Sequence, residues 1–206
     1  MKDDVQMPLW VFDLGNVILN VDFERFARRL TQGSALESEQ ALEAFGSGPD
    51  KAALDRGLTG PVAFGQHLVQ WRGDDALSVA QAMDAWADIF EVIPGAVQGL
   101  ARCRASGPVW LLSDTDPIHF SGALSRFEVV RGFDRYLLSY ARGMLKRDPG
   151  AFDELGALVH SGQPVVFVDD LPINIEAARA AGVDAILFEG WQALMPQLHA
   201  RGLPVG

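Results

Sequence analysis

Near its start the chain reads Leu9-Trp-Val-Phe-Asp-Leu-Gly-Asn-Val17, an apolar run that ends in a carboxylate and a glycine turn. Open parallel sheets bind ligands in the crevice beyond the carboxyl ends of their strands. A buried strand gains nothing structurally from an ionised side chain at its end, because desolvating an unpaired charge is costly. Asp13 is therefore either part of a ligand site or a turn residue that accepts backbone N–H bonds.

Three later segments carry polar side chains at or near the ends of expected strands. Pro108-Val-Trp-Leu-Leu-Ser-Asp-Thr115 is an apolar run that ends in the hydroxyl of Ser113. Gly143-Met-Leu-Lys-Arg-Asp-Pro149 is a loop that carries Lys146. Pro164-Val-Val-Phe-Val-Asp-Asp170 ends in paired carboxylates, and Asn174 follows four residues later. Each segment alone is a weak indication, but four in this order are specific.

The order Asp, Ser, Lys and Asp-Asp resembles the haloacid dehalogenase-like (HAD) hydrolase superfamily, from Trp10 to about Phe188. Phe12-Asp-Leu-Gly-Asn-Val-Ile together with Asn174-Ile-Glu-Ala-Ala looks most like the subgroup that includes small sugar-phosphate phosphatases. The resemblance implies a Rossmann-like core in which the first and fourth strands are neighbours. It also implies an inserted helical cap over the active site.

The pattern of apolar runs gives the same fold class. Strands are expected at about 8–13, 108–113, 136–139, 165–169 and 184–188, and helices at 95–105 and 173–181, the second ending at Gly182. Alternating strands and helices predict a doubly wound parallel sheet in an α/β fold. Residues 20–92 show helical periodicity with no strand-like run, which predicts an α-helical cap between core segments 1–19 and 93–206. Residues 1–7 are expected to form a polar tail.

Composition limits the partners and the compartment. A formal net charge of −10 over 206 residues argues against nucleic acid or an anionic membrane as the main partner. The N-terminus has no apolar signal core and no apolar run reaches membrane-spanning length, so a cytoplasmic protein is expected. Cys103 is the only cysteine and lies in a helical pattern, which favours a buried structural thiol. The oligomeric state is left open.

The resemblance implies a chemical role for each motif residue. Asp13 would be the nucleophile that forms an aspartyl-phosphate, Ser113 would bind a phosphate oxygen, and Lys146 would neutralise the nucleophile and the phosphate. Converging carboxylates repel one another unless a cation lies among them, and oxygen ligands with a phosphate substrate favour Mg²⁺. The expected Mg²⁺ ligands are Asp13, Asp170 and the carbonyl of Gly15, with Asp169 acting through water, and the expected substrate-binding residues are Ser113, Asp114, Lys146 and Asn16.

Simpler structural roles remain open for several of these residues. Asp170 can be a helix N-cap, and Asn174 can either orient Asp170 or start that helix. Ser113 can satisfy a backbone group at the strand end, and Lys146 can be a solvated loop lysine. The sequence alone does not decide between these roles.

The sequence departs from the family pattern at three positions. Phosphatases of this superfamily usually carry a general acid two residues after the nucleophile, where this chain has Gly15. Asp22 is a candidate acid, or the N-cap of the following helix, and Asp114 is a second candidate acid. Asp114 stands where the subgroup has a neutral Asn, so Asp114 and Asp116 are expected to add negative charge at the pocket mouth. Arg147 replaces a proline, either as a compensating cation or as a surface residue.

These features predict an Mg²⁺-dependent phosphatase of a small phosphorylated metabolite, with a sugar 1-phosphate as the candidate substrate. The first alternative is a dehalogenase-type hydrolase, which needs no metal. The second is a non-catalytic binding or regulatory protein with the same fold, which Gly15 and Asp114 favour. A serine hydrolase is not expected because no G-x-S-x-G motif is present. Zinc is not expected because the four histidines are scattered and there is one cysteine, the histidines being His67, His119, His160 and His199.

Overall fold

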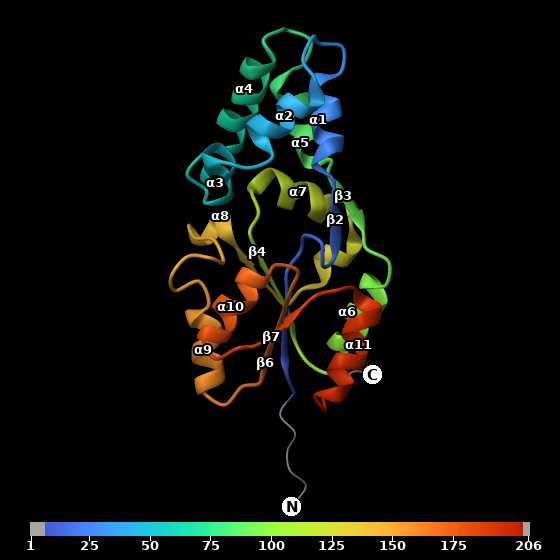
Figure 1. Cartoon of the computed structure of the whole chain (residues 1–206), viewed down its shortest axis with the longest axis vertical. Coiled ribbons are helices and arrows are strands. Elements are labelled where there is room, and N and C mark those ends of the chain that lie inside the picture. Colours follow the sequence, from blue (N-terminus) through green and yellow to red (C-terminus); the bar gives the residue numbers. More distant parts are fainter. Residues whose placement is uncertain (1–6, 204–206) are drawn as a thin grey trace, which may run out of the picture.

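A parallel sheet forms the centre of the protein (Figure 1). The computed structural model describes residues 7–203, so the expected polar tail lies outside the described residues except for Met7. Within the described range the main sheet has five strands in the order β5-β4-β1-β6-β7. Their bounds are β1 Leu9–Phe12, β4 Val109–Ser113, β5 Arg135–Leu138, β6 Val165–Asp169 and β7 Asp184–Leu187. The predicted doubly wound parallel sheet is confirmed.

Strand β1 lies in the middle of the sheet, between β4 and β6. Phe12 is in register with Leu111 on one side and with Val168 on the other. The backbone N–H of Asp13 continues the ladder by donating to the carbonyl of Val168 at 2.9 Å. Because all the strands are parallel, the polar residues that end β1, β4 and β6 meet at one edge of the sheet. The predicted neighbourhood of the first and fourth core strands is confirmed.

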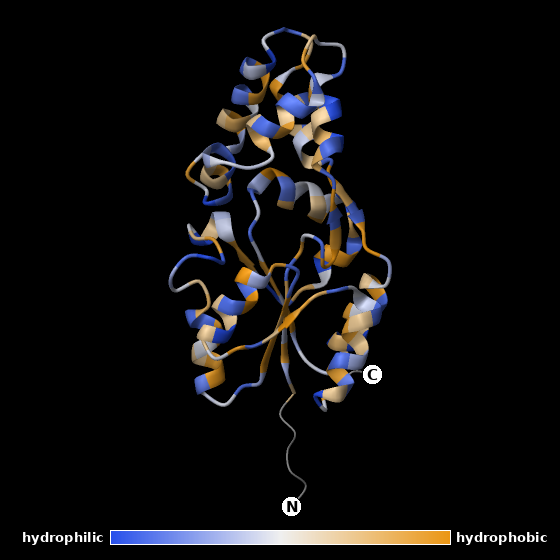
Figure 2. Cartoon of the chain, viewed as in Figure 1, coloured by the Kyte–Doolittle hydropathy of each residue, from blue (hydrophilic) through white to orange (hydrophobic). Residues whose placement is uncertain are grey.

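Helices cover both faces of this sheet, because alternate strand residues point to opposite sides. Val11 and Phe167 pack under α9 (Asp153–His160) and α10 (Pro172–Ala180). Trp10 and Phe12 face the other side, towards α6 (Ala96–Arg104) and α11 (Trp191–Ala200). Figure 2 shows hydrophobic residues along the central strands and on the flanking helices. The resulting two-sided core holds the strand ends in fixed positions.

A second layer of helices lies beyond the carboxyl edge of the sheet, at the top of Figure 1. Phe26, Phe45, Phe64 and Trp86 form its core, and the Phe26 and Trp86 rings meet edge to face at 4.7 Å. The helices are α1 Phe23–Thr31, α2 Ser38–Phe45, α3 Pro49–Asp55, α4 Pro61–Arg72 and α5 Val79–Ala87. Its role as a cap domain over 20–92 stays a prediction.

The expectation that no strand occurs between the first core strand and residue 108 is wrong. Strands β2 (Leu19–Val21) and β3 (Phe90–Val92) pair as an antiparallel ribbon between the sheet and the helical layer. Asn20 lies opposite Glu91 in this ribbon. Strands of three residues are too short to show a period-2 pattern, so no periodicity in the sequence indicated them.

The remaining elements complete the connections around the sheet. Helix α7 (Pro117–Arg126) follows β4, the 3₁₀ segment η1 (Glu128–Gly132) leads into β5, and α8 (Ser139–Arg142) follows it. Cys103 is buried on α6 as predicted, and burial raises the pKa of its thiol to about 12. Among the helices of residues 7–203, none is long and apolar enough to cross a membrane.

Trp191 of α11 supports the turn that follows Asp13. Its indole Nε1 donates to the carbonyl of Val17 at 2.9 Å, and its ring lies 5.6 Å from that of Phe12. Gly99 of α6 leaves the space for this ring, since a Cβ on Gly99 would lie 1.9 Å from Trp191 Cε3. The contact between α6 and α11 therefore helps to fix the turn.

We expect Gly99→Ala to lower the free energy of unfolding by about 1–3 kcal/mol, because the added methyl group overpacks the Trp191 site. Gly60→Ala is the matched control, since a Cβ there meets nothing within 4 Å and its φ is −76°. The control should lower stability by no more than about 1 kcal/mol, the usual cost of Ala at an N-cap position such as Gly60. Urea denaturation measures both, and equal stabilities for the two variants would contradict the packing argument.

Candidate active site

The carboxylate of Asp13 lies at the bottom of a site formed by strand ends. Its side chain follows β1 and is buried. The ammonium of Lys146, which is 2 % exposed, lies 2.8 Å from Asp13 Oδ1 and 2.5 Å from Asp169 Oδ2. Lys146 is therefore a buried bridge between two strand ends rather than a solvated loop lysine.

Asp169 is fully buried and its oxygens are occupied by protein donors. It accepts the Asn174 amide at 3.0 and 3.1 Å and the backbone N–H of Leu171 at 2.8 Å, besides the Lys146 ammonium. Asn174 thus orients Asp169, and the expectation that it orients Asp170 is wrong. These contacts fix the position of the Lys146 ammonium.

Asp170 is half-buried and is held from the turn after β1. Asn16 Nδ2 donates to Asp170 Oδ2 at 3.1 Å, and the φ of Asn16 is 53°, in the left-handed region that Asn tolerates. Helix α10 begins at Pro172 without a side-chain cap, so Asp170 is not its N-cap. Its carboxylate is left facing the site.

Burial dominates the electrostatics of this cluster. It raises the pKa of Asp13 to about 7, with Lys146 opposing the shift and Asp169 adding to it. Burial alone would lower the pKa of Lys146, but the carboxylates of Asp13 and Asp169 outweigh it and raise that pKa. Carboxylate oxygens of Asp13, Asp169 and Asp170 all lie within 4.8 Å of one another. Because protein donors occupy Asp169, the carboxylates of Asp13 and Asp170 are the two of this cluster that fit a hard cation such as Mg²⁺.

Ser113 and Asp114 end β4 beside this cluster. The Ser113 side chain is buried, and its hydroxyl has no hydrogen-bond partner in residues 7–203. Asp114 Oδ1 accepts the backbone N–H of Lys146 at 2.9 Å, and burial raises the pKa of its carboxyl. Asp114 therefore anchors the loop that carries Lys146.

The expectation that Asp116 adds charge at the pocket mouth is wrong. Asp116 is fully buried as the N-cap of α7, where it accepts the backbone N–H groups of Ile118 and His119 at 2.8 and 2.9 Å. Trp86 Nε1 donates to it at 3.0 Å. Arg147 is exposed, so it is a surface residue. The negative charge of Asp116 therefore caps α7 and binds Trp86 instead of facing the cavity.

A cavity of about 260 Å³ opens over these groups. All the predicted site residues line it except Asp169, which lies behind Lys146, so Asp13, Gly15, Asn16, Ser113, Asp114, Lys146 and Asp170 share one cavity. The other lining residues include Val21, Phe23, Lys51, Ile89, Phe90 and His119. Sequence reasoning missed Lys51 and His119. His119 follows Ser113 by six residues, and that closeness to a strand end was the available indication.

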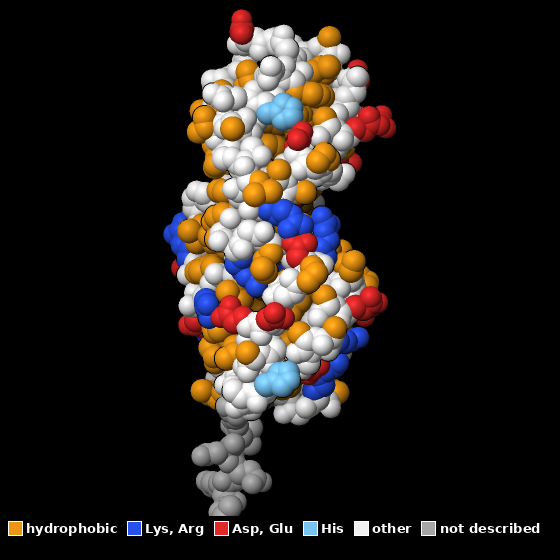
Figure 3. All heavy atoms as spheres, turned by 90° about the vertical axis from the view of Figure 1, so that its left-hand side faces the viewer, with side chains coloured by type: hydrophobic (Ala, Val, Ile, Leu, Met, Phe, Trp, Pro, Cys, Tyr) orange, Lys and Arg blue, Asp and Glu red, His pale blue; other side chains and the backbone are white. Residues whose placement is uncertain are grey.

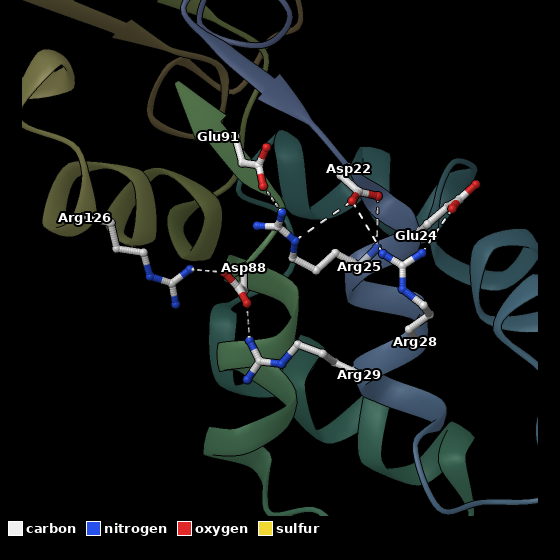
Figure 4. Close-up of polar contacts among 8 residues, drawn as sticks. All are labelled: Asp22, Glu24, Arg25, Arg28, Arg29, Asp88, Glu91 and Arg126. Atoms are coloured by element: carbon white, nitrogen blue, oxygen red, sulfur yellow. Dashed lines mark hydrogen bonds and ion pairs between the residues drawn. The ribbon is translucent and has the colours of Figure 1, made fainter. Parts of the chain in front are cut away.

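Asp22 belongs to an ion-pair cluster at the ribbon rather than to this cavity (Figure 4). It caps α1 by accepting the backbone N–H of Arg25 at 3.1 Å, and its carboxylate lies 3.6 Å from Arg28. Asp88 pairs with Arg29 of α1 at 2.7 Å and with Arg126 of α7 at 3.1 Å. The N-cap alternative for Asp22 is confirmed, and it does not serve as the missing acid.

A second ion pair joins the helical layer to the loop of Lys146. Arg56, after α3, binds Asp148 through both guanidinium nitrogens, with 2.8 Å between Nη2 and Oδ1. The Arg56 guanidinium lowers the pKa of Asp148 to about 2. Asp148 also accepts the backbone N–H of Leu145 at 2.8 Å. Figure 3 shows basic and acidic side chains together at the narrow middle of the molecule on this face.

The fold is shared with solved structures of HAD enzymes. A HAD family enzyme from Bacteroides thetaiotaomicron is 24% identical, with coverage of 92% of this chain and 98% of that chain and a TM-score of 0.78. That enzyme also has a structure in complex with magnesium and inorganic phosphate. A predicted HAD-like family hydrolase from Porphyromonas gingivalis is 24% identical, with 95% and 98% coverage and a TM-score of 0.74.

A haloacid dehalogenase shares the fold at lower similarity. The 2-haloacid dehalogenase from Pseudomonas syringae is 16% identical, with 95% and 99% coverage and a TM-score of 0.61. No family model matches the sequence. At these identities the similarities establish the HAD fold that the sequence predicted.

We expect Lys146→Met to lower the free energy of unfolding in EDTA by about 3–5 kcal/mol, because it leaves buried carboxylates without their counter-charge. Arg147→Met is the control, since the neighbouring Arg147 is exposed. It should change stability by less than about 0.5 kcal/mol. Guanidinium denaturation measures both, and a stable Lys146→Met variant would show that the buried bridge is not needed for folding.

Proposed function

We propose that this HAD-fold protein is an Mg²⁺-dependent phosphatase of a small phosphorylated metabolite, acting through an aspartyl-phosphate. The observation that carries the proposal is the pair formed by Asp13 and Lys146 at the buried end of a cavity. Phosphoryl transfer depends mainly on positioning and charge stabilisation. A carboxylate nucleophile divides the hydrolysis into two easier steps.

Asp13 attacks phosphorus in the first step, and the P–O bond to the leaving group breaks. Lys146 holds the attacking carboxylate in place and balances the negative charge that the phosphate brings into the site. The unpartnered hydroxyl of Ser113 donates to a phosphate oxygen. Water then hydrolyses the aspartyl-phosphate and restores Asp13.

The residues that would hold Mg²⁺ are Asp13, Asp170 and the carbonyl of Gly15. The ion would supply positive charge that offsets the repulsion between the phosphate and the carboxylates. Asp169 is already bound by protein donors, which suits it to holding Lys146 rather than the metal. Asn16 keeps Asp170 directed at the site.

The cavity suits a small substrate, because about 260 Å³ is below the usual range for ligand pockets. A sugar 1-phosphate is the candidate, with its phosphate at Asp13 and its sugar against the wall formed by Phe23, Phe90 and His119. The helices α1–α5 serve as the cap that closes over it. Asp114 gives one oxygen to the backbone N–H of Lys146, and the nearby Lys146 ammonium offsets part of its negative charge.

We expect purified protein to hydrolyse one or more sugar phosphates in a screen of phosphorylated metabolites. EDTA should abolish the activity and added Mg²⁺ should restore it, because the carboxylates repel the phosphate without the ion. Mg²⁺ should also raise the melting temperature, since it binds only the folded chain. EDTA-resistant turnover of a haloacid would favour a dehalogenase, and Mg²⁺ binding without any turnover would favour a non-catalytic protein.

We expect Asp13→Asn to lower kcat by about 10³-fold or more, because the amide lacks the attacking anionic oxygen. Asp184→Asn is the control, since Asp184 is exposed at the opposite end of β7. Circular dichroism should show both variants folded. Phosphate release at the wild-type rate from Asp13→Asn would refute the aspartyl-phosphate mechanism.

A further inference from the structure

His119 is a buried titratable group that the mechanism above leaves without a role in the chemistry. It lies on the first turn of α7, is 3 % exposed, and lines the same cavity as Asp13, Gly15 and Ser113. The cavity is small, so a substrate that fills it meets every lining residue. His119 is therefore within the space of the substrate.

Asp116 fixes the proton arrangement on this imidazole. Its Oδ2 lies 2.5 Å from His119 Nδ1, while its other oxygen accepts the backbone N–H groups of Ile118 and His119. Trp86 Nε1 donates to the same carboxylate at 3.0 Å. A carboxylate with this many N–H donors stays an acceptor, so Nδ1 carries a proton. The second nitrogen, Nε2, is then free for another partner.

Aromatic rings lock the orientation of His119. Trp86 stacks on it at 4.5 Å with an interplanar angle of 23°. Phe23 and Phe90 meet its edge at 5.9 and 5.5 Å, and both also line the cavity. The direction of Nε2 is thus set by packing as well as by Asp116.

His119 Nε2 is buried and has no hydrogen-bond partner among the described residues. Buried polar atoms are nearly always satisfied, so an unpartnered buried atom on a residue that lines a cavity points to a ligand that completes its hydrogen bonding. Asp55 Oδ1 is the other buried orphan, and the second oxygen of Asp55 binds Lys51 at 2.6 Å. The acidic groups that interact with His119 are Asp116, the N-cap of its helix, and Asp55 of α3, whose second oxygen is paired with Lys51.

The other titratable groups that line the cavity are already engaged. Asp13, Lys146 and Asp170 form the phosphate end, and Lys51 pairs with Asp55. Asp114 uses one oxygen, Oδ1, to anchor the Lys146 loop. Gly15 has no side chain at the position where related phosphatases carry an acid. Within residues 7–203, His119 is the cavity-lining residue with a buried titratable atom, Nε2, that has no hydrogen-bond partner.

We propose that His119 is the general acid and base of the reaction, in the role that Gly15 lacks a side chain to perform. This rests on the proposed phosphatase function. The first step needs the imidazolium form, which carries a proton on both ring nitrogens. When the P–O bond breaks, its electron pair stays on the leaving oxygen, which takes the Nε2 proton and leaves a neutral imidazole with its proton on Nδ1. When water attacks the aspartyl-phosphate, Nε2 accepts the proton of that water, and the Asp13–phosphorus bond breaks. Together the two steps convert a phosphate ester and water into an alcohol and inorganic phosphate, and they restore Asp13 and His119.

The test compares a poor and a good leaving group with Mg²⁺ present. The substrates are the sugar phosphate found in the screen and p-nitrophenyl phosphate, whose leaving oxygen needs no proton. The variants are His119→Asn, whose amide keeps a donor for Asp116, and His119→Gln, whose amide reaches the Nε2 position but cannot transfer a proton. His199→Gln, on an exposed histidine of α11, is the control.

We expect both His119 variants to lower kcat/KM for the sugar phosphate by about 10²-fold or more, and for p-nitrophenyl phosphate by less than about tenfold. The control should match the wild type. Equal losses on both substrates, no loss on either, or full activity of His119→Gln alone would overturn the proposal while leaving the phosphatase function intact. Turnover that does not depend on Asp13, or no ester hydrolysis by the wild type, would refute the phosphatase function and the proton transfer together.

Discussion

The ammonium of Lys146, buried between Asp13 and Asp169, is the interaction on which the site depends. A lone buried charge is costly, and here each of the three charges offsets the burial of the others. The bridge joins the ends of β1 and β6 to the loop after α8. Only a parallel sheet brings these segments to one edge, so the fold and the electrostatics require each other. The contacts of Asn174 and Asp114 then fix the bridge on both sides.

The sequence predicted the five-stranded core, because each main strand has an apolar run with a polar end. It also predicted which residues share the cavity, because the motifs keep their order along the chain. It did not predict β2 and β3, whose three residues are too few to form a pattern. Nor did it predict how the side chains pair. The bond of Trp86 to Asp116 joins two helices 30 residues apart, and no local pattern encodes such a contact.

The acidic residues that depart from the family pattern are absorbed by the fold. Asp114 accepts a backbone N–H of the Lys146 loop, and Asp116 accepts four N–H groups around the start of α7. The sequence places Asp114 and Asp116 just after β4, which predicted two negative charges that would repel a phosphate. This count misleads for Asp116, because a carboxylate that accepts hydrogen bonds from several donors projects little charge beyond them. The charge of Asp114, which lines the cavity, is offset by the Lys146 ammonium. Partner geometry, rather than residue type, decides what a substrate would meet.

Asp148 connects the helical layer to the loop that carries Lys146. Its carboxylate holds Arg56 of the helical layer and also the backbone N–H of Leu145, next to Lys146. Lifting α3 away from the sheet would break the first contact and loosen the second. One carboxylate thus ties the loop of Lys146 to α3, so the position of this loop depends on a contact outside the sheet. In the proposed mechanism, a helical layer held in place by Asp148 would keep bulk water away from Asp13. The aspartyl-phosphate would then be hydrolysed only by water that the site admits.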